Sequence, residues 1–296
     1  MLNPILDGLG QEKLGTSGLA RLTPKDALRF FAAKALSKKT LVFSRKDDWE
    51  WPIRNNIRGF VPFFYEFDEI DIDYFDAIIP LTIPAQKYVN ANLSHLIRHK
   101  ALIPSNAAMD LCDNKERCAN FLIGNGFKNI TPKTNEDLRY PYILKKKIGA
   151  WGEEISVISD SCSERSHVKQ IESEDYFRQE YIEGHDEYTT HIIINDGTIV
   201  FARTIKFTFA EMYFVKGKHF KETRREVVDH GHLNNLFQKI LNKIDYQGTC
   251  CFNYKIVEGT VKLFEINPRF GGSMPIFMTE ALIAYRGALA AWRKTP

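Results

Sequence analysis

The stretch VKLFEINPRFGGS at residues 261–273 constrains the fold of this chain more than any other. Side chains of a β-strand alternate between its two faces, so Glu265, Asn267 and Arg269 share one face. Pro268 has no N–H to give to a neighbouring strand and therefore marks the end of this one. The residues expected to point the other way, into a core, are Phe264 and Ile266. The pattern predicts a strand whose polar face opens into a cleft.

The same strand forms the second arm of a predicted hairpin, residues 249–270, whose tip carries Gly259. Three-residue hairpin loops need a residue in the left-handed conformation, which glycine adopts without strain. With such a loop ending at Gly259, Asn253 lies on the face of Glu265, one diagonal step away and within roughly 7 to 8 Å. A two-residue loop would put Asn253 on the opposite face. With the three-residue loop, Asn253, Glu265 and Asn267 can present oxygen atoms to one hard cation such as Mg²⁺.

A second polar segment is a lysine-rich strand that runs into a glycine turn. The stretch YPYILKKKIGAWGEEI, residues 140–155, delivers Lys145 into a turn from Gly149 to Gly152. Lysine is a mobile point charge that suits phosphate, and glycines let backbone amides approach an anion. An exposed strand end beside a turn is the ordinary alternative for this pattern.

Two further stretches supply groups suited to a nucleoside. In FRQEYIEGHDEYTTHIII, residues 177–194, an extended backbone with free donors and acceptors can pair with the edge of adenine. The residues of that extended part are Gln179, Glu180, Tyr181 and Ile182. Past a glycine, Glu187 can accept hydrogen bonds from ribose hydroxyls, although a surface hairpin with ordinary acids has the same pattern. In VFARTIKF, residues 200–207, Arg203 and Lys206 fall on opposite faces of a regular strand, so we expect only one to reach a site.

The first hundred residues are predicted to form a small α/β unit. TPKDALRFFAAKAL, residues 23–36, has a threonine cap and a proline at the first helical position. Short buried strands are expected at 40–44 and 75–82, with a helix over 85–103 after the second strand. An amphipathic helix over 113–127 ends at glycines, and the rest of the chain has strand-like patterns.

Composition excludes several classes of protein. The chain has 296 residues, 40 basic and 37 acidic, so a nucleic-acid partner is not indicated and anionic small molecules fit better. Its five cysteines form no C-x-x-C pair, which predicts reduced thiols rather than disulfides or a zinc site. We find no signal peptide and no apolar run of the roughly 20 residues that span a bilayer, so we expect a cytoplasmic protein without a membrane partner. The sequence also lacks the G-x-G-x-x-G and G-x-x-x-x-G-K-[ST] phosphate motifs, so a nucleotide must be held by other means.

The four polar segments, in this order, resemble the ATP-grasp superfamily, most of all its carboxylate–amine ligases and the large-chain modules of carbamoyl phosphate synthetase. The resemblance covers about residues 105–290 and is most specific in EINPRFGGS. It implies an α/β chain of the α+β type in which two α+β subdomains hold ATP between them. The implied boundaries are 1–105 for a shortened N-terminal α/β domain, 106–180 for the small subdomain and 181–296 for the C-terminal subdomain.

The resemblance also implies roles for the nucleotide-binding residues. Lys145 resembles the lysine that holds the ATP phosphates, and the turn at 149–152 resembles the loop that closes over them. Residues 179–182 look like the hinge that reads adenine. Glu187 resembles the ribose acid, and Asp186 is its alternative because the G-H-D-E spacing is one residue longer than the common G-x-E.

At the phosphate end, the resemblance implies a metal site and a catalytic cation. Glu265 and Asn267 look like ligands of Mg²⁺, with Mn²⁺ as the alternative ion, and Arg269 looks like the cation that faces the transferred phosphoryl group. Asn253 stands where the superfamily often has aspartate, glutamate or glutamine.

The implied activity is that of an ATP-dependent ligase. ATP phosphorylates a carboxylate, and an amine or another nucleophile captures the acyl phosphate, which leaves ADP and phosphate as products. The alternatives are a kinase that phosphorylates a hydroxyl or a small acid, and a nucleotide-binding module without catalysis. Small-molecule partners are expected in the first two cases, and the sequence is compatible with a homodimer.

Overall fold

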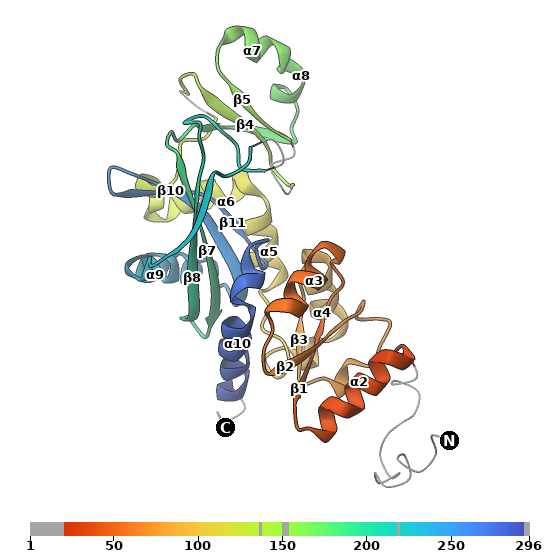
Figure 1. Ribbon diagram of the computed structural model, residues 1–296. Coiled ribbons are helices and arrows are strands. Elements are labelled where there is room, and N and C mark those ends of the chain that lie inside the picture. The colour runs from red at the N-terminus through yellow and green to blue at the C-terminus, as the bar shows by residue number, and fades with distance from the viewer. Residues whose placement is uncertain (1–20, 136–137, 150–153, 218–219, 293–296) are drawn as a thin grey trace.

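The computed structural model describes residues 21–135, 138–149, 154–217 and 220–292 (Figure 1). Three separate sheets follow one another along the chain, the first parallel and the other two antiparallel. Helices cover the sheets, so the chain combines α and β structure as expected. In the described part of the chain, no helix is long and apolar enough to cross a membrane.

The N-terminal unit is a three-stranded parallel sheet in the order β2-β1-β3. Its strands are β1 (Lys39–Phe43), β2 (Phe60–Phe64) and β3 (Ala77–Ile79), and its helices are α2 (Pro24–Ala35), α3 (Asp47–Asn56) and α4 (Ile83–Asn92). The predicted start of α2 is confirmed, because the Thr23 side chain accepts a hydrogen bond from the backbone of Asp26. Sequence patterns missed β2, whose central Pro62 argues against a strand; β2 is an edge strand, where proline is tolerated. The helix expected over 85–103 ends at Asn92.

The helix expected over 113–127 is confirmed by α6 (Lys115–Leu122), which is followed by a short π-helical segment at Ile123–Phe127. Sequence patterns missed α5 (Asn106–Asp113), which precedes α6 and is separated from it by Asn114 in an extended conformation. The Asn114 side chain accepts from the backbone of Arg117 and so caps α6. The break matters because it places Lys115 at the first turn of a new helix.

The second sheet is small and antiparallel, in the order β5-β4-β6. Its strands are β4 (Tyr142–Lys146), β5 (Ile155–Ile158) and β6 (Tyr176–Glu180), and the short helices are α7 (Ser161–Ser166) and α8 (Val168–Ile171). Its core is limited to Tyr142, Leu144 and Ile158. The strand expected to carry Lys145 is confirmed: it is β4, the central strand of this sheet.

The third sheet has five antiparallel strands in the order β11-β10-β7-β8-β9. Its elements are β7 (Asp186–Asn195), β8 (Thr198–Thr208), β9 (Arg224–Val228), α9 (Asn234–Ile244), β10 (Gly248–Val257), β11 (Thr260–Asn267) and α10 (Met278–Trp292). Alternation along β7 sends Ile192 and Ile194 into a core with α5, α6 and α9. Ile193 belongs to the opposite core, together with residues of α10 and the N-terminal unit. In Figure 1, α10 lies between the five-stranded sheet and the N-terminal unit. The sheet is thus covered on both faces.

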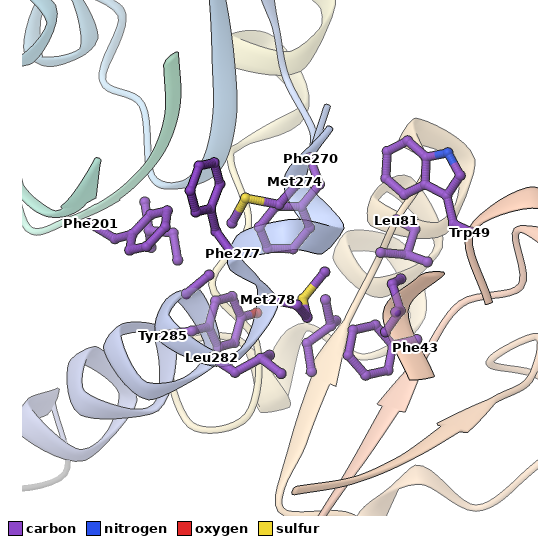
Figure 2. Close-up of a cluster of buried hydrophobic side chains, with 14 of the residues drawn as sticks. Phe43, Trp49, Leu81, Phe201, Phe270, Met274, Phe277, Met278, Leu282 and Tyr285 are labelled. Carbon is purple, nitrogen blue, oxygen red and sulfur yellow. The ribbon is translucent and has the colours of Figure 1, made fainter. Parts of the chain in front are cut away.

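One apolar cluster joins the N-terminal unit to α10 (Figure 2). The side chains that meet there include Phe43, Trp49 and Leu81 from the N-terminal unit and Phe270, Met274, Phe277, Met278, Leu282 and Tyr285 from the C-terminal part. The buried Tyr285 hydroxyl accepts from the Leu102 backbone at 2.6 Å and donates to the Ile78 carbonyl at 2.9 Å. This shared core fixes the N-terminal unit against the larger sheet.

The hairpin of β10 and β11 differs from the expected register in two compensating ways. Its turn has two residues, Glu258 and Gly259, both with positive φ, and Val257 pairs with Thr260; the predicted three-residue loop was wrong. A bulge then interrupts the pairing next to Asn253, so that Asn253 lies directly opposite Glu265. Asn253 and Glu265 therefore do lie on the same face of the hairpin, as expected, but the cause is the bulge and not the length of the turn.

The bulge also changes the position of Phe264. This residue is skipped in the pairing, since its neighbours Leu263 and Glu265 pair with consecutive residues of β10. Phe264 is half-buried and lines the cleft, whereas Ile266 is fully buried in the core. The expectation that both side chains point into the core holds for Ile266 and is wrong for Phe264.

Candidate active site

A cavity of about 530 Å³ lies between the small sheet and the five-stranded sheet. Its walls come from β4, β6, β10 and β11, and Lys46 and Trp49 of the N-terminal unit close one side. Most of the residues singled out in the sequence line it: Lys145, Gln179, Glu180, Tyr181, Ile182, Glu187, Asn253, Glu265, Asn267 and Arg269. The polar face of β11 therefore opens into a cleft, as its sequence predicted.

Arg203 and Lys206 lie outside this cavity, which corrects their expected role. The Arg203 guanidinium pairs with Glu280 of α10 at 2.7 Å, and the Lys206 ammonium pairs with Asp186 at 2.8 Å. The two side chains do leave opposite faces of β8, but each meets an acid there before it can reach the cleft. Gly149 does not line the cavity, and Gly152 lies outside the described residues.

Glu187 and Asp186 take different faces of β7 because they are consecutive strand residues. Glu187 is buried and lines the cavity, where its carboxylate pairs with Lys216 at 2.6 Å. Asp186 accepts from the Thr208 hydroxyl at 2.7 Å in addition to its pair with Lys206. Of the two candidate ribose acids, only Glu187 faces the cleft.

Glu265 is a carboxylate surrounded by cations in the wall of the cavity. Burial raises the pKa of its carboxyl group, but the surrounding cations, led by Lys115, outweigh burial and hold the pKa below its usual value. The Lys115 ammonium lies 3.5 Å from the Glu265 carboxylate, and the Asn253 amide nitrogen is also 3.5 Å away. The carboxylate is therefore ionised and can bind a cation.

Lys145 is a buried cation with one firm partner. Its ammonium donates to Gln179 Oε1 at 2.6 Å and lies 5.5 Å from the centre of the Phe264 ring. Burial lowers the pKa of Lys145 to about 8. Because an ammonium can only donate, the Gln179 oxygen must face it, which leaves Gln179 Nε2 as a buried donor without a partner among the described residues.

Sequence patterns missed three lysines that shape the site. Lys115 donates to the Gly149 carbonyl at 2.7 Å besides its contact with Glu265. Lys216 follows β8 and donates to Thr189 at 2.9 Å in addition to its pair with Glu187. No local pattern distinguishes Lys115 from a solvated helix residue or Lys216 from a loop lysine.

The third missed lysine, Lys255, braces the hinge after β6. Its ammonium donates to the carbonyls of Ile182 at 2.9 Å and Gly184 at 2.8 Å. It also lies 4.2 Å from the centre of the Phe214 ring, and burial lowers the pKa of Lys255 to about 8. Since Lys255 alternates with Asn253 on β10, strand alternation could have suggested that the two share a face.

Comparison with known proteins decides the family. A family model described as an ATP-grasp domain matches residues 112–273, which is more than half of the chain. The chain belongs to the ATP-grasp family. The match spans the small sheet and the whole five-stranded sheet, including the polar strand β11. No curated protein sequence matches the chain.

Solved structures of similar fold agree with this membership. The D-alanine–D-alanine ligase of Bacillus anthracis, complexed with ATP, aligns with a TM-score of 0.60 at 14% identity, covering 88% of this chain and 99% of that one. Biotin carboxylase of Campylobacter jejuni aligns with a TM-score of 0.56 at 16% identity, covering 93% and 70%. An L-amino acid ligase of Bacillus licheniformis aligns with a TM-score of 0.53 at 17% identity, covering 81% and 69%. At these identities the likeness concerns the fold, which is that of the ATP-grasp family.

The residues of this ATP-grasp cleft fit a nucleotide. The orphaned Gln179 Nε2 is a buried donor that needs an acceptor, and the hinge that follows it is extended and lines the same cavity. Lys145, which touches the same Gln179 side chain, and Arg269 supply positive charge for phosphates. One cavity therefore holds a buried donor, an extended hinge and two cations.

The fit to Mg²⁺ is good for two of the three expected ligands. Glu265 and Asn267 line the cavity from the same strand and offer a carboxylate and an amide oxygen. Asn253 Oδ1 instead accepts from the Thr189 hydroxyl at 2.7 Å, and its amide nitrogen faces Glu265. In this orientation Asn253 holds Glu265 in place and does not offer its oxygen to the ion.

Replacing Asn253 by aspartate is expected to make stability depend more strongly on Mg²⁺. The Thr189 hydroxyl can donate to a carboxylate as it does to the amide, but the contact with Glu265 becomes a repulsion between like charges. Without Mg²⁺ we expect the variant to melt about 2 to 8 °C below wild type, and saturating Mg²⁺ should raise its Tm more than that of wild type. Asn253→Ala, which adds no charge, is the matched control. Equal Mg²⁺-dependent shifts in all three proteins would contradict an ion at this strand pair.

Proposed function

We propose that the chain is an ATP-dependent ligase that activates a carboxylate as an acyl phosphate and transfers the acyl group to an amine or another nucleophile. The observation that carries the proposal is a single cavity lined by an extended hinge, two cations and an ionised Glu265. ADP and inorganic phosphate would be the products. The proposed small-molecule substrates agree with the names of similar structures, two of which are amino-acid ligases.

In this proposal the protein acts mainly by positioning the substrates and by neutralising the negative charge that develops during phosphoryl transfer. Phosphoryl transfer spreads negative charge over oxygen atoms, which Lys145 and Arg269 can face from the walls of the cavity. Glu187 would take the ribose hydroxyls and residues 179–182 the adenine edge. Glu265 and Asn267 would hold Mg²⁺ or Mn²⁺, which when bound would supply positive charge that offsets the charge of the phosphates.

ATP binding is expected to take up a proton at mildly alkaline pH. The pKa of Lys145 is lowered to about 8 by burial, and phosphate oxygens beside the ammonium would raise it again. At about pH 9 the free protein is largely deprotonated at Lys145 and binding restores the proton, whereas at about pH 6.5 the proton is already present. Calorimetric titrations in buffers with different ionisation enthalpies measure this uptake.

Lys145→Arg is the control for this prediction, because arginine stays protonated throughout. The variant should bind ATP with less proton uptake at about pH 9 than wild type, and with similar, small uptake at about pH 6.5. Equal uptake by both proteins at the alkaline pH would show that Lys145 does not meet the phosphates.

ATP turnover across a panel of carboxylates and amines tests the proposal. A ligase forms ADP only with a suitable acid and nucleophile together, apart from slow uncoupled hydrolysis. Formation of a stable phosphorylated product without any amine would support the kinase instead. ATP binding without turnover on any pair would support the non-catalytic module, and AMP with pyrophosphate would reject the acyl-phosphate route.

We also propose a cellular location and an oligomeric state for the enzyme. All five cysteines are free thiols, as the sequence predicted, and four of them are buried. Free thiols are usual in a reducing compartment, which agrees with the proposed cytoplasmic location without membrane or nucleic-acid partners. A homodimer is the proposed assembly, and sedimentation of the purified chain tests it.

A further inference from the structure

A histidine outside the proposed phosphoryl-transfer machinery lies beneath the turn that follows Arg269. His191, on β7, is 0% exposed, and its Nε2 atom lies 2.8 Å from the hydroxyl oxygen of Ser273. Ser273 is half-buried and lines the active-site cavity. A fully buried imidazole thus touches a hydroxyl group at the wall of the cleft.

The turn is seated directly on this imidazole. A Cβ atom added to Gly271 would lie 2.7 Å from His191 Cε1 and 2.9 Å from Cys251 Sγ, so only glycine fits. The turn is closed by a 2.9 Å hydrogen bond from the Met274 backbone to the Gly271 carbonyl. The position of Ser273 is therefore tied to the position of the ring.

The imidazole is neutral. Burial, together with the positive charge of Lys216, lowers the pKa of His191 to about 3. A neutral imidazole carries one proton, on either Nδ1 or Nε2, and the hydrogen bonds of the two atoms decide which.

The surroundings of the ring select the proton on Nε2. His191 Nδ1 is buried and has no hydrogen-bond partner among the described residues. A proton on Nδ1 would be a buried N–H without an acceptor, which native structures rarely contain. With the proton on Nε2, the Nε2–H group donates a hydrogen bond to Ser273 Oγ. Nδ1 then carries a lone pair without a partner among the described residues, which costs less than a buried N–H without an acceptor.

We propose that His191 is a positioning residue: its Nε2–H donates to Ser273 Oγ and thereby commits the Ser273 hydroxyl proton to an acceptor atom in the cleft. This inference rests on the proposed function in one respect, namely that the acceptor is a carboxylate oxygen of the acid substrate. With the opposite tautomer, the hydroxyl proton would point at the ring and Ser273 could only accept. A substrate ammonium group, which can only donate, is therefore excluded from this position.

The charges nearby favour the same ligand. Arg269 lines the cavity four residues before Ser273, and Lys216, whose positive charge acts on His191, lines it as well. Lys216 is already paired with Glu187, so Arg269 is the cation that, with the hydroxyl donor of Ser273, suits an anionic oxygen and disfavours an ammonium group. The wall around Ser273 is thus assigned to the acid and not to the amine.

Nitrogen NMR of the full chain labelled with ¹⁵N-histidine tests the tautomer without any substrate. The chain has eight histidines, and the His191 signals are identified by their loss in His191→Gln. We expect a neutral ring at about pH 7 with its proton on Nε2. A proton on Nδ1, or a charged ring, would overturn the inference, whether or not the chain is a ligase.

Variants test the consequence for the acid in the hydroxamate assay, with hydroxylamine as the nucleophile. His191→Gln keeps a donor at the place of Nε2, His191→Leu removes it, and Ser273→Ala removes the hydroxyl. We expect the KM for the carboxylate to rise about 10- to 100-fold in the leucine and alanine variants, with that for ATP unchanged and the glutamine variant near wild type. Equal KM values for the carboxylate in the glutamine and leucine variants would overturn the positioning role. If no carboxylate supports hydroxamate formation by wild type, the proposed function fails, and the tautomer still decides the assignment of His191.

Discussion

Arg269→Ala is expected to lower turnover by about 10² to 10³ while the protein folds normally. The Arg269 side chain is half-buried in the cavity wall, and among the described residues its guanidinium takes part in no ion pair. Its positive charge is thus available to the transferred phosphoryl group. Because the side chain holds no other element in place, its removal should cost little folding stability.

Steady-state turnover and thermal melting of the same preparation measure both parts of this prediction. Arg224→Ala is the matched control, since Arg224 is exposed on β9 and its one ion pair within the described residues is with Glu226, a contact worth little at a surface. Glu265→Gln should resemble Arg269→Ala in turnover, because it removes the one carboxylate of the proposed metal site. Near-wild-type turnover of Arg269→Ala would contradict the assignment of this cleft to phosphoryl transfer.

Lys115→Met is expected to have an effect of similar size, about 10² in turnover, together with a loss of stability. Lys115 is buried, and its ammonium joins the Gly149 carbonyl to Glu265, which lines the cavity. Methionine fills much the same space without the charge, so Glu265 would lose its nearest cation. We expect a lower Tm without nucleotide and a weaker affinity for ATP.

The matched control is Lys87→Met, which removes an exposed lysine that pairs with Asp110 on the neighbouring helix. It should change neither turnover nor Tm measurably. Lys115→Arg separates charge from geometry, because it keeps the cation in a larger side chain. If Lys115→Met bound ATP and turned over like wild type, the lysine would have only a structural role.

The polar segments of the site could be predicted because each depends on local pattern. Alternation along β11 predicts Glu265, Asn267 and Arg269 on the cleft face, and the lysine-rich run before the glycine turn predicts the strand that carries Lys145. The order of these segments then led to the fold, which the family match bears out. The division into three domains stays a prediction, and α5 and α6, assigned to the small subdomain, share a core with the five-stranded sheet.

What could not be predicted depends on contacts between distant segments. The bulge that turns Phe264 into the cleft arises from the pairing of two whole strands, and no residue at the turn announces it. Lys115 and Arg203 are two further examples: no sequence pattern indicates that Lys115 belongs to the site, and the pattern around Arg203 suggests a site role for it. In the sequence the buried Lys115 looks like an ordinary helix residue, and Arg203 looks like a candidate site residue, although in the structure it pairs with Glu280 of α10.

Transfer of ¹⁸O from a labelled carboxylate tests the central claim most directly. If a carboxylate oxygen attacks the terminal phosphorus of ATP, ADP leaves, and later attack by the amine on the acyl carbon releases phosphate that carries this oxygen. With an acid and an amine that support turnover, we predict ¹⁸O in the inorganic phosphate, which mass spectrometry detects. Turnover that leaves the phosphate free of ¹⁸O, or that puts the label into AMP, would contradict the account.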